Sequence, residues 1–172
     1  DFHRAGNLVA AEKLYRTILQ VEPNHADSIH LLGVIANQVG NQSAAIQLIS
    51  AAIQLNPNSS IYYNNLGEAY RALERFGDAK QCYLHSLKLQ PGYSDACNNL
   101  GIVLQHEGNL EAAEQFYRQC LSTQPEQVEA ISNLGTVLQA NGLLNEAEEQ
   151  FLRALQLNPH HAATHNNLGR IY

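Results

Sequence analysis

The chain has 172 residues and a formal net charge of −6 at pH 7, and 15% of its residues are charged. Its ten Lys and Arg residues are scattered and form no basic cluster of the kind that binds nucleic acid, and no apolar run is long enough to insert into a membrane. The three cysteines, Cys82, Cys97 and Cys120, include no C-x-x-C pair, which argues against a disulfide framework and against a structural zinc site.

All five prolines of the chain are spaced by 34 residues without insertion or deletion. They are Pro23, Pro57, Pro91, Pro125 and Pro159. A strict period of this length is typical of stacked helical repeats, in which each repeat buries its apolar face against its neighbours. Alignment on the prolines predicts four full repeats, with a partial repeat at each end, within one all-α solenoid. The predicted boundaries are 1–25, 26–59, 60–93, 94–127, 128–161 and 162–172.

Three positions within the repeat hold residues of restricted size. Gly follows Leu at the eighth position, Ala stands at the twentieth, and a large or aromatic residue stands at the twenty-fourth. The glycines are Gly33, Gly67, Gly101, Gly135 and Gly169, and the large residues are Tyr15, Ile49, Tyr83, Tyr117 and Phe151. Because small residues let helix backbones approach closely, we expect two helices to cross at these positions, with the large residue filling the space between helix pairs.

The apolar residues of each repeat recur at three- and four-residue steps, which predicts two amphipathic helices. The first helix should end at the fifteenth position, where glycine accepts the left-handed conformation without strain. These glycines are Gly6, Gly40, Gly108 and Gly142. Repeat 60–93 has Glu74 at that position and Gly77 three residues later, so we expect its turn to be shifted. The second helix should end before each proline.

The order Leu-Gly, Ala, aromatic residue and Pro at these offsets resembles the tetratricopeptide repeat, over the full length of the chain. The family's preferred Trp at the fourth position is replaced here by Ile29, Tyr63, Cys97, Ile131 and His165. The resemblance implies a right-handed superhelical solenoid of antiparallel helix-turn-helix repeats. It also implies that the first helices line a concave groove and that the second helices form the convex face.

Asparagines form a column on the predicted concave surface. The sixth position holds Asn65, Asn99, Asn133 and Asn167, and the fifth holds His30, Asn64, Asn98, Ser132 and Asn166. An amide offers donors and an acceptor, so such a column can pair with the backbone of an extended peptide. The alternative is that Asn is a tolerated polar residue on a solvated helix face. Arg71 and Gln105 share the twelfth position of the same surface, where Arg71 could contact an acidic side chain or stand in solvent.

Other binding modes fit the sequence less well. In the family's carboxylate clamp, which binds the C-terminal acid of a partner, Lys, Arg and Asn residues stand at five fixed positions. Of the five residues at those positions here, only Asn65 matches. His161 and His165 have the spacing of helical metal ligands, but no acidic or Cys ligand is near them in sequence. Phosphate-binding glycine loops and a strained nucleophile turn are missing from the sequence, so we expect no cofactor, no metal and no catalysis by this chain.

The second helix of repeat 26–59, residues 43–55, contains no charged residue. Its predicted outward positions include Gln47, Leu48 and Ala51, and Ile46 adjoins them. Such a neutral patch suggests a self-association surface and a homodimer. The alternative is that this helix is locally apolar and has no partner.

The sequence thus predicts a scaffold that binds a protein or peptide in an extended form along its groove. The asparagine column is also similar to the ladder in the superhelix of O-linked N-acetylglucosamine transferases, which implies the alternative of a substrate-recruiting arm of a larger glycosyltransferase. A third possibility is an accessory factor of bacterial assembly or secretion. We expect a cytoplasmic location and, because both ends cut through a first helix, a natural chain that continues beyond Tyr172.

Overall fold

The computed structural model describes residues 7–171, and within that range the chain forms helices joined by short turns, without strands. The expectations for Gly6 and Tyr172 therefore lie outside the described residues. The chain divides into two compact units, Asp1–Leu89 and Gln90–Tyr172, which are described separately below.

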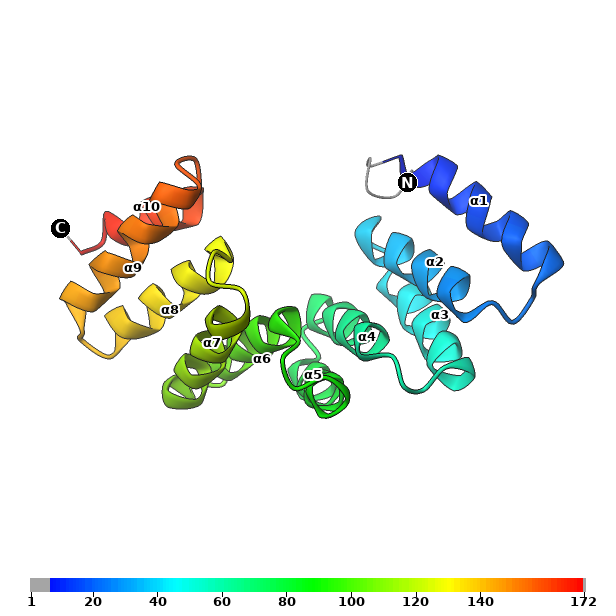
Figure 1. Ribbon diagram of the computed structural model, residues 1–172, viewed down its shortest axis with the longest axis horizontal. Coiled ribbons are helices and arrows are strands. Elements are labelled where there is room, and N and C mark those ends of the chain that lie inside the picture. Colours follow the sequence, from blue (N-terminus) through cyan, green and yellow to red (C-terminus); the bar gives the residue numbers. More distant parts are fainter. Residues whose placement is uncertain (1–6, 172) are drawn as a thin grey trace. The chain divides into compact units, whose positions relative to one another are not determined.

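The first unit is built from two helix pairs and one further helix. Its helices are α1 (Leu8–Val21), α2 (Ala26–Gln38), α3 (Gln42–Leu55), α4 (Ser60–Ala72) and α5 (Phe76–Leu89). Helix α2 pairs with α3 and α4 pairs with α5, while α1 packs on α2 and α3 packs on α4 (Figure 1). Each pair corresponds to one predicted repeat.

The second unit repeats the same plan. Its helices are α6 (Ser94–His106), α7 (Leu110–Thr123), α8 (Val128–Ala140), α9 (Leu144–Leu157) and α10 (Ala162–Leu168). Helices α6 and α7 form one pair, α8 and α9 form the next, and α10 packs on α9. The prediction of an all-α fold of helix-turn-helix repeats is confirmed, whereas the single 1–172 solenoid stays a prediction.

The predicted close crossing within each repeat is confirmed at the eighth-position glycines. A Cβ atom added to Gly67 would lie 2.5 Å from Cε1 of Tyr83, and one added to Gly101 would lie 2.6 Å from Cε1 of Tyr117. Both tyrosine rings are fully buried. The large residue therefore lies directly over the glycine of its own helix pair, and this contact fixes how the two helices meet.

The predicted shift of the turn in repeat 60–93 is wrong. Glu74 itself adopts the left-handed conformation, with φ of 57°, as Gly40 does with 83°. Helix α5 begins at Phe76, in the same register as α3, and Gly77 lies inside it. Packing of Tyr83 on Gly67 sets the register of this pair, and it outweighs the roughly 1–2 kcal/mol that a left-handed conformation costs a residue other than glycine.

Candidate functional site

Three of the sixth-position asparagines, Asn65, Asn133 and Asn167, form a hydrogen bond to the preceding repeat. In the first unit, Nδ2 of Asn65 lies 2.9 Å from Nε2 of His30. In the second unit, Nδ2 of Asn133 donates to Oδ1 of Asn98 at 3.1 Å. In both cases the amide reaches the fifth-position residue of the preceding first helix, which lies 35 residues earlier in the chain. Asn167 also reaches back, because its Nδ2 donates to Oγ1 of Thr136 at 3.0 Å.

The fifth and sixth positions differ in exposure. Four fifth-position side chains are buried between helices: His30, Asn64, Asn98 and Ser132. Asn166, at the same position of α10, is exposed. At the sixth position Asn65, Asn133 and Asn167 are half-buried, and Asn99 is buried. Most fifth-position residues therefore have a packing role, and Asn65, Asn133 and Asn167 are the partly accessible sixth-position members of the column.

The Asn133 amide is held in place with unused hydrogen-bonding capacity. Its Nδ2 uses one hydrogen on Asn98, and the side chains of Asn133 and Asn167 make no other hydrogen bond within residues 7–171. Each of these two amides therefore keeps a second N–H and an Oδ1 acceptor. Asn65 is more fully engaged, because its Oδ1 also accepts from Nδ2 of Asn64 at 3.3 Å.

The twelfth-position residues meet the buried tyrosines. The hydroxyl of Tyr117 donates to Oε1 of Gln105 at 2.9 Å, so Gln105 is engaged within its own repeat. In the preceding repeat the half-buried Arg71 stands beside Tyr83. Burial raises the pKa of Tyr83, and the Arg71 guanidinium opposes that rise. The guanidinium is near enough to the hydroxyl to act on it as a hydrogen-bond donor, although neither Nε of Arg71 nor the Tyr83 hydroxyl has a partner of good geometry within residues 7–171.

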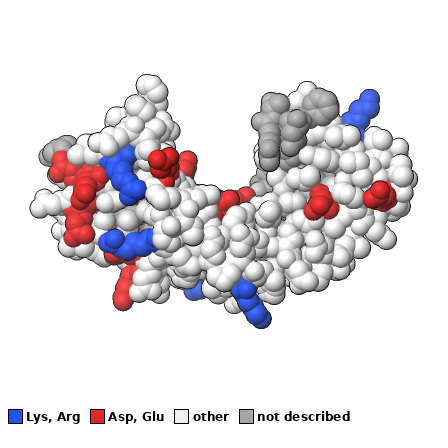
Figure 2. Space-filling model, in the orientation of Figure 1, with Lys and Arg blue, Asp and Glu red and all other residues white. Residues whose placement is uncertain are grey.

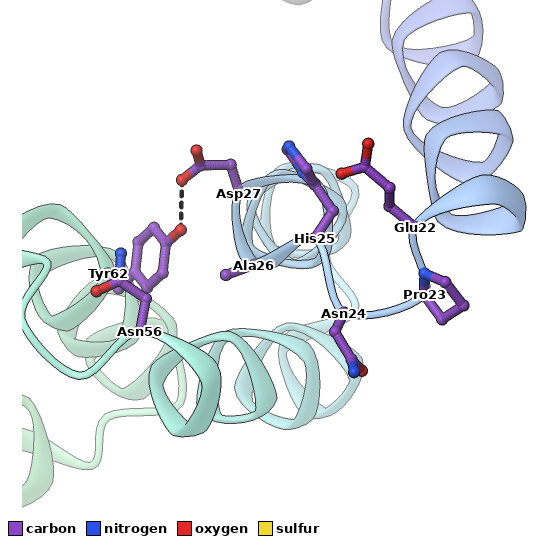
Figure 3. Close-up of a pocket in the computed structure, with 8 residues that line it drawn as sticks. All are labelled: Glu22, Pro23, Asn24, His25, Ala26, Asp27, Asn56 and Tyr62. Carbon is purple, nitrogen blue, oxygen red and sulfur yellow. Dashed lines mark hydrogen bonds between the residues drawn. The ribbon is translucent and has the colours of Figure 1, made fainter.

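A contact that the sequence analysis missed joins α2 to α4. The Tyr62 hydroxyl donates to Oδ1 of Asp27, and the two side chains point toward each other (Figure 3). They border an open depression of 490 Å³, whose other lining residues include Glu22, His25 and Asn56. Burial, and then the neighbouring Asp27, raise the pKa of Tyr62.

Tyr62 also contacts the asparagine column, because its ring stacks on His30, the partner of Asn65, with the ring centroids 4.3 Å apart. Asp27 and Tyr62 lie 35 residues apart, as His30 and Asn65 do. A search of the sequence for polar partners at that offset, one more than the repeat period, would have found both pairs.

The C-terminal repeats hold buried hydroxyls that sequence reasoning also missed. Oγ1 of Thr164 donates to Oγ of Ser132 at 2.8 Å, and Nδ1 of His161 lies 2.6 Å from Oγ1 of Thr164. Nε2 of His165 lies 2.8 Å from the carbonyl oxygen of Pro159. The two histidines that have metal-ligand spacing therefore bond to separate groups. No cluster of three or more His, Cys, Asp or Glu suited to a metal ion occurs in the described part of the chain.

The candidate self-association surface on α3 is less exposed than the sequence predicts. Leu48 was expected to point outward, but it is half-buried and packs against a cluster that includes Tyr15 and Leu32. Ile46 packs against the next cluster, beside Ile49. The reason is that α3 is covered on two sides, by the α1–α2 layer and by α4. Ala51 is half-buried, and only Gln47 of these four candidates is exposed. The homodimer stays a prediction.

The distribution of charge differs between the two units. On the face shown in Figure 2, acidic and basic side chains gather on the part formed by residues 90–172, whereas the part formed by residues 7–89 is largely uncharged. Residues 28–67 contain no Asp, Glu, Lys or Arg. None of the helices in the described range is long and apolar enough to cross a lipid bilayer.

Comparison with known proteins agrees with the repeat pattern. Models described as tetratricopeptide repeat match residues 1–60, 60–93, 82–115 and 104–171. No sequence match is found among curated proteins. A crystal structure of MamA aligns with a TM-score of 0.76 at 25% identity, over 92% of each chain.

Two further solved structures share the fold. TTC0263, a thermophilic TPR protein of Thermus thermophilus, aligns with a TM-score of 0.81 at 22% identity, over 99% of this chain and 93% of its own. A chain of the APC/C hetero-tetramer Cut9-Hcn1 aligns with a TM-score of 0.92 at 18% identity, over 99% of this chain and 34% of its own.

The family matches and the similarity to MamA support a protein-interaction scaffold in general and suggest a non-catalytic module. With helix pairs of 34-residue period, glycine–tyrosine crossings in successive pairs and family models that together extend from residue 1 to residue 171, the chain belongs to the tetratricopeptide repeat family.

Proposed function

We propose that the chain holds an extended segment of a partner protein along the sixth-position asparagines Asn133 and Asn167, on α8 and α10 of its second unit. The observation that carries this proposal is the state of Asn133, whose amide is anchored to Asn98, half-buried, and left with one N–H and an acceptor oxygen. A fixed amide loses little rotamer entropy when a ligand binds, so it is preorganised for the partner.

The chemistry of the amide favours a backbone as the ligand. An extended peptide presents N–H and C=O groups in regular alternation, and an amide can accept from the first and donate to the second. Asn133 and Asn167, in successive repeats of the second unit, offer the same pair of unused groups. Contacts to backbone groups select an extended conformation with little regard to the partner's side chains.

A purely structural role for the asparagines makes a different prediction. If the amides only tie neighbouring repeats together, then Asn133→Ala and Asn98→Ala should each cost about 1 kcal/mol of stability, because both remove the same hydrogen bond. Neither variant would then differ from the parent in peptide binding. If the Asn133 amide also holds a ligand, Asn133→Ala should weaken binding far more than Asn98→Ala does.

The experiment is a peptide array probed with the parent, with Asn98→Ala and with a combined Asn133→Ala and Asn167→Ala variant. Asn145→Ala is the matched control, because Asn145 is exposed on α9, a second helix. We expect the combined variant to lose at least about tenfold in affinity for the peptides that the parent binds, with its unfolding transition retained. Equal binding by the parent and the combined variant would refute the proposal.

A role as the recruiting arm of a larger glycosyltransferase, a homodimer contact on α3 and a cytoplasmic location all stay predictions.

A further inference from the structure

Two arginines from different helices line one depression of the second unit. The depression has a volume of 300 Å³ and is formed by α7, which supplies Arg118, by α8, and by α9, which supplies Arg153. Its other described lining residues, none of them acidic, are Leu121, Ser122, Leu134 and Gln150. Residues 90–172 contain nine acidic residues and three basic ones, Arg118, Arg153 and Arg170. Two of the three bases of an acidic unit therefore share one depression.

Arg153 is held at the depression by a contact that does not need its charge. Its Nη2 donates to the carbonyl oxygen of Pro125, in the turn before α8. One repeat earlier Gln119 makes the equivalent contact, because its Nε2 donates to the carbonyl oxygen of Pro91 at 2.9 Å. A guanidinium has five N–H donors, and Arg153 is half-buried and forms no ion pair within residues 7–171. It therefore brings an unpaired positive charge, anchored at the turn, to the depression.

Arg118 is paired with an acid, but that acid is not among the lining residues. Its Nε and Nη2 each lie 2.9 Å from Oε1 of Glu114, one turn earlier on α7. The Arg118 side chain is 55% exposed, and exposed ion pairs of this kind contribute little to stability. Its Nη1 stays available as a donor. A ligand with one negative charge would only repeat what Glu114 already provides, whereas a doubly charged ligand would interact more strongly with the two guanidinium groups.

The first unit shows that the fold does not require this arrangement. Arg16, three repeat periods before Arg118, pairs with Glu12 on α1 at 2.8 Å. The depression beside them has a volume of 230 Å³, and both Glu12 and Arg16 line it. Ala51 holds the position there that Arg153 holds in the second unit. The first unit therefore has one paired base at the equivalent depression, whereas the second has two bases and no acid among the described lining residues.

We infer that the depression in the second unit binds the phosphate group of a phosphorylated Ser or Thr side chain of a partner protein. At pH 7 such a phosphate carries a charge of about −1.5 to −2 and has three acceptor oxygens, so it can bond to both guanidinium groups together. The half-buried Gln150 makes no hydrogen bond within residues 7–171, and its N–H groups can serve a further oxygen. Leu121 and Leu134 supply apolar surface for the side-chain carbon atoms that carry the phosphate. This site is separate from the asparagine column, because its two arginines lie on second helices.

The test uses small probes and needs no partner. N-acetyl-phosphoserine N′-methylamide is titrated into the ¹⁵N-labelled chain at about pH 7.5, where the phosphate is largely doubly charged, and ¹H–¹⁵N NMR follows the Nε–Hε signals of Arg118 and Arg153. The comparison probes are N-acetyl-glutamate N′-methylamide and inorganic phosphate. We expect saturable shifts of both signals, with an affinity at least about tenfold higher for the phosphoserine derivative than for the glutamate derivative. Inorganic phosphate should bind more weakly, because it lacks the carbon atoms that Leu121 and Leu134 can contact.

The variants remove one guanidinium at a time. Arg153→Gln should weaken binding at least about tenfold, and it should fold because Gln119 makes the same backbone contact one repeat earlier. Arg118→Gln, at an exposed residue, should weaken binding to a similar extent. Arg16→Gln is the matched control, because it removes the equivalent ion pair of the first unit, and it should leave binding unchanged.

Absence of saturable shifts, or an unchanged affinity in folded Arg153→Gln and Arg118→Gln variants, would overturn the phosphate site. Equal affinity for the glutamate derivative would identify a carboxylate site and overturn the phosphate chemistry. Inorganic phosphate that binds as tightly as the phosphoserine derivative would overturn the assignment to a side chain. The combined Asn133→Ala and Asn167→Ala variant should bind the phosphoserine derivative as the parent does, so failure of the proposed function and failure of this site are distinguishable.

Discussion

Replacing Glu74 by glycine should stabilise the protein, because the side chain at this position contributes strain without compensating contacts. Glu74 has φ of 57°, and its side chain is exposed. A left-handed conformation costs a residue with a Cβ atom roughly 1–2 kcal/mol, and glycine removes that cost. Glycine also adds about 0.5–1 kcal/mol of entropy to the unfolded chain. Taken at the middle of the two ranges, the difference leaves a net stabilisation of about 0.75 kcal/mol.

Urea denaturation followed by far-UV circular dichroism measures this effect. The midpoint should rise while the slope m stays constant, because the surface exposed on unfolding does not change. The reverse substitution, Gly108→Glu, is the matched comparison, since Gly108 has φ of 79° at the equivalent position. It should lower the free energy of unfolding by a similar amount. An unchanged or lower midpoint for Glu74→Gly would show that the left-handed conformation is not the source of strain.

Three further outcomes follow from contacts inside the helix pairs. Gly67→Ala should lower the free energy of unfolding by about 1–3 kcal/mol in urea denaturation, because its Cβ would lie 2.5 Å from Tyr83; an unchanged midpoint would contradict the close approach. Tyr117→Phe should lower the free energy of unfolding by about 1 kcal/mol, because Gln105 loses its hydrogen-bond donor. Tyr83→Phe should leave thermal stability unchanged or higher, because the Tyr83 hydroxyl has no partner of good geometry within residues 7–171. Equal losses of stability in the two variants would refute this difference between the repeats. Burial raises the pKa of Cys82 from 9.0 to about 12, so above about pH 9 this thiol should lower the free energy of unfolding by about 1.4 kcal/mol per pH unit, because the unfolded thiol ionises first. Burial also raises the pKa of Cys97 and Cys120, so urea denaturation of Cys82→Ala should show a shallower fall with pH than that of the parent; an identical slope would refute this contribution.

The sequence allowed the helix pairs to be predicted, because those depend on local patterns. Glycine at the eighth position and a large residue at the twenty-fourth are complementary in size, so the contact between Gly101 and Tyr117 could be expected from spacing alone. The ends of the second helices followed from the prolines, since α3 ends at Leu55 and α9 at Leu157, two residues before a proline.

Features that depend on the stagger between neighbouring repeats could not be predicted in the same way. The sequence placed Asn98 and Asn133 on one surface, but it did not show that a 35-residue offset brings their amides within 3.1 Å. The sequence also placed Leu48 on the outer surface, because its packing against the cluster that includes Tyr15 and Leu32 depends on how α1 and α2 meet beside α3. The left-handed Glu74 was missed because a tertiary contact outweighed a local preference.

The bond between Asn133 and Asn98 has a consequence for engineering. Each anchored amide depends on a single residue of the repeat before it, so the orientation of one asparagine is independent of repeats farther away. In a chimera, one helix pair could therefore be replaced by a pair from another member of the family. Such an exchange would change the ligand contacts of one asparagine and leave those of the others unchanged. For Asn65 and Asn133, the residue that must accompany the transplanted asparagine lies 35 positions earlier, at the fifth position of the preceding first helix, whereas for Asn167 it is Thr136.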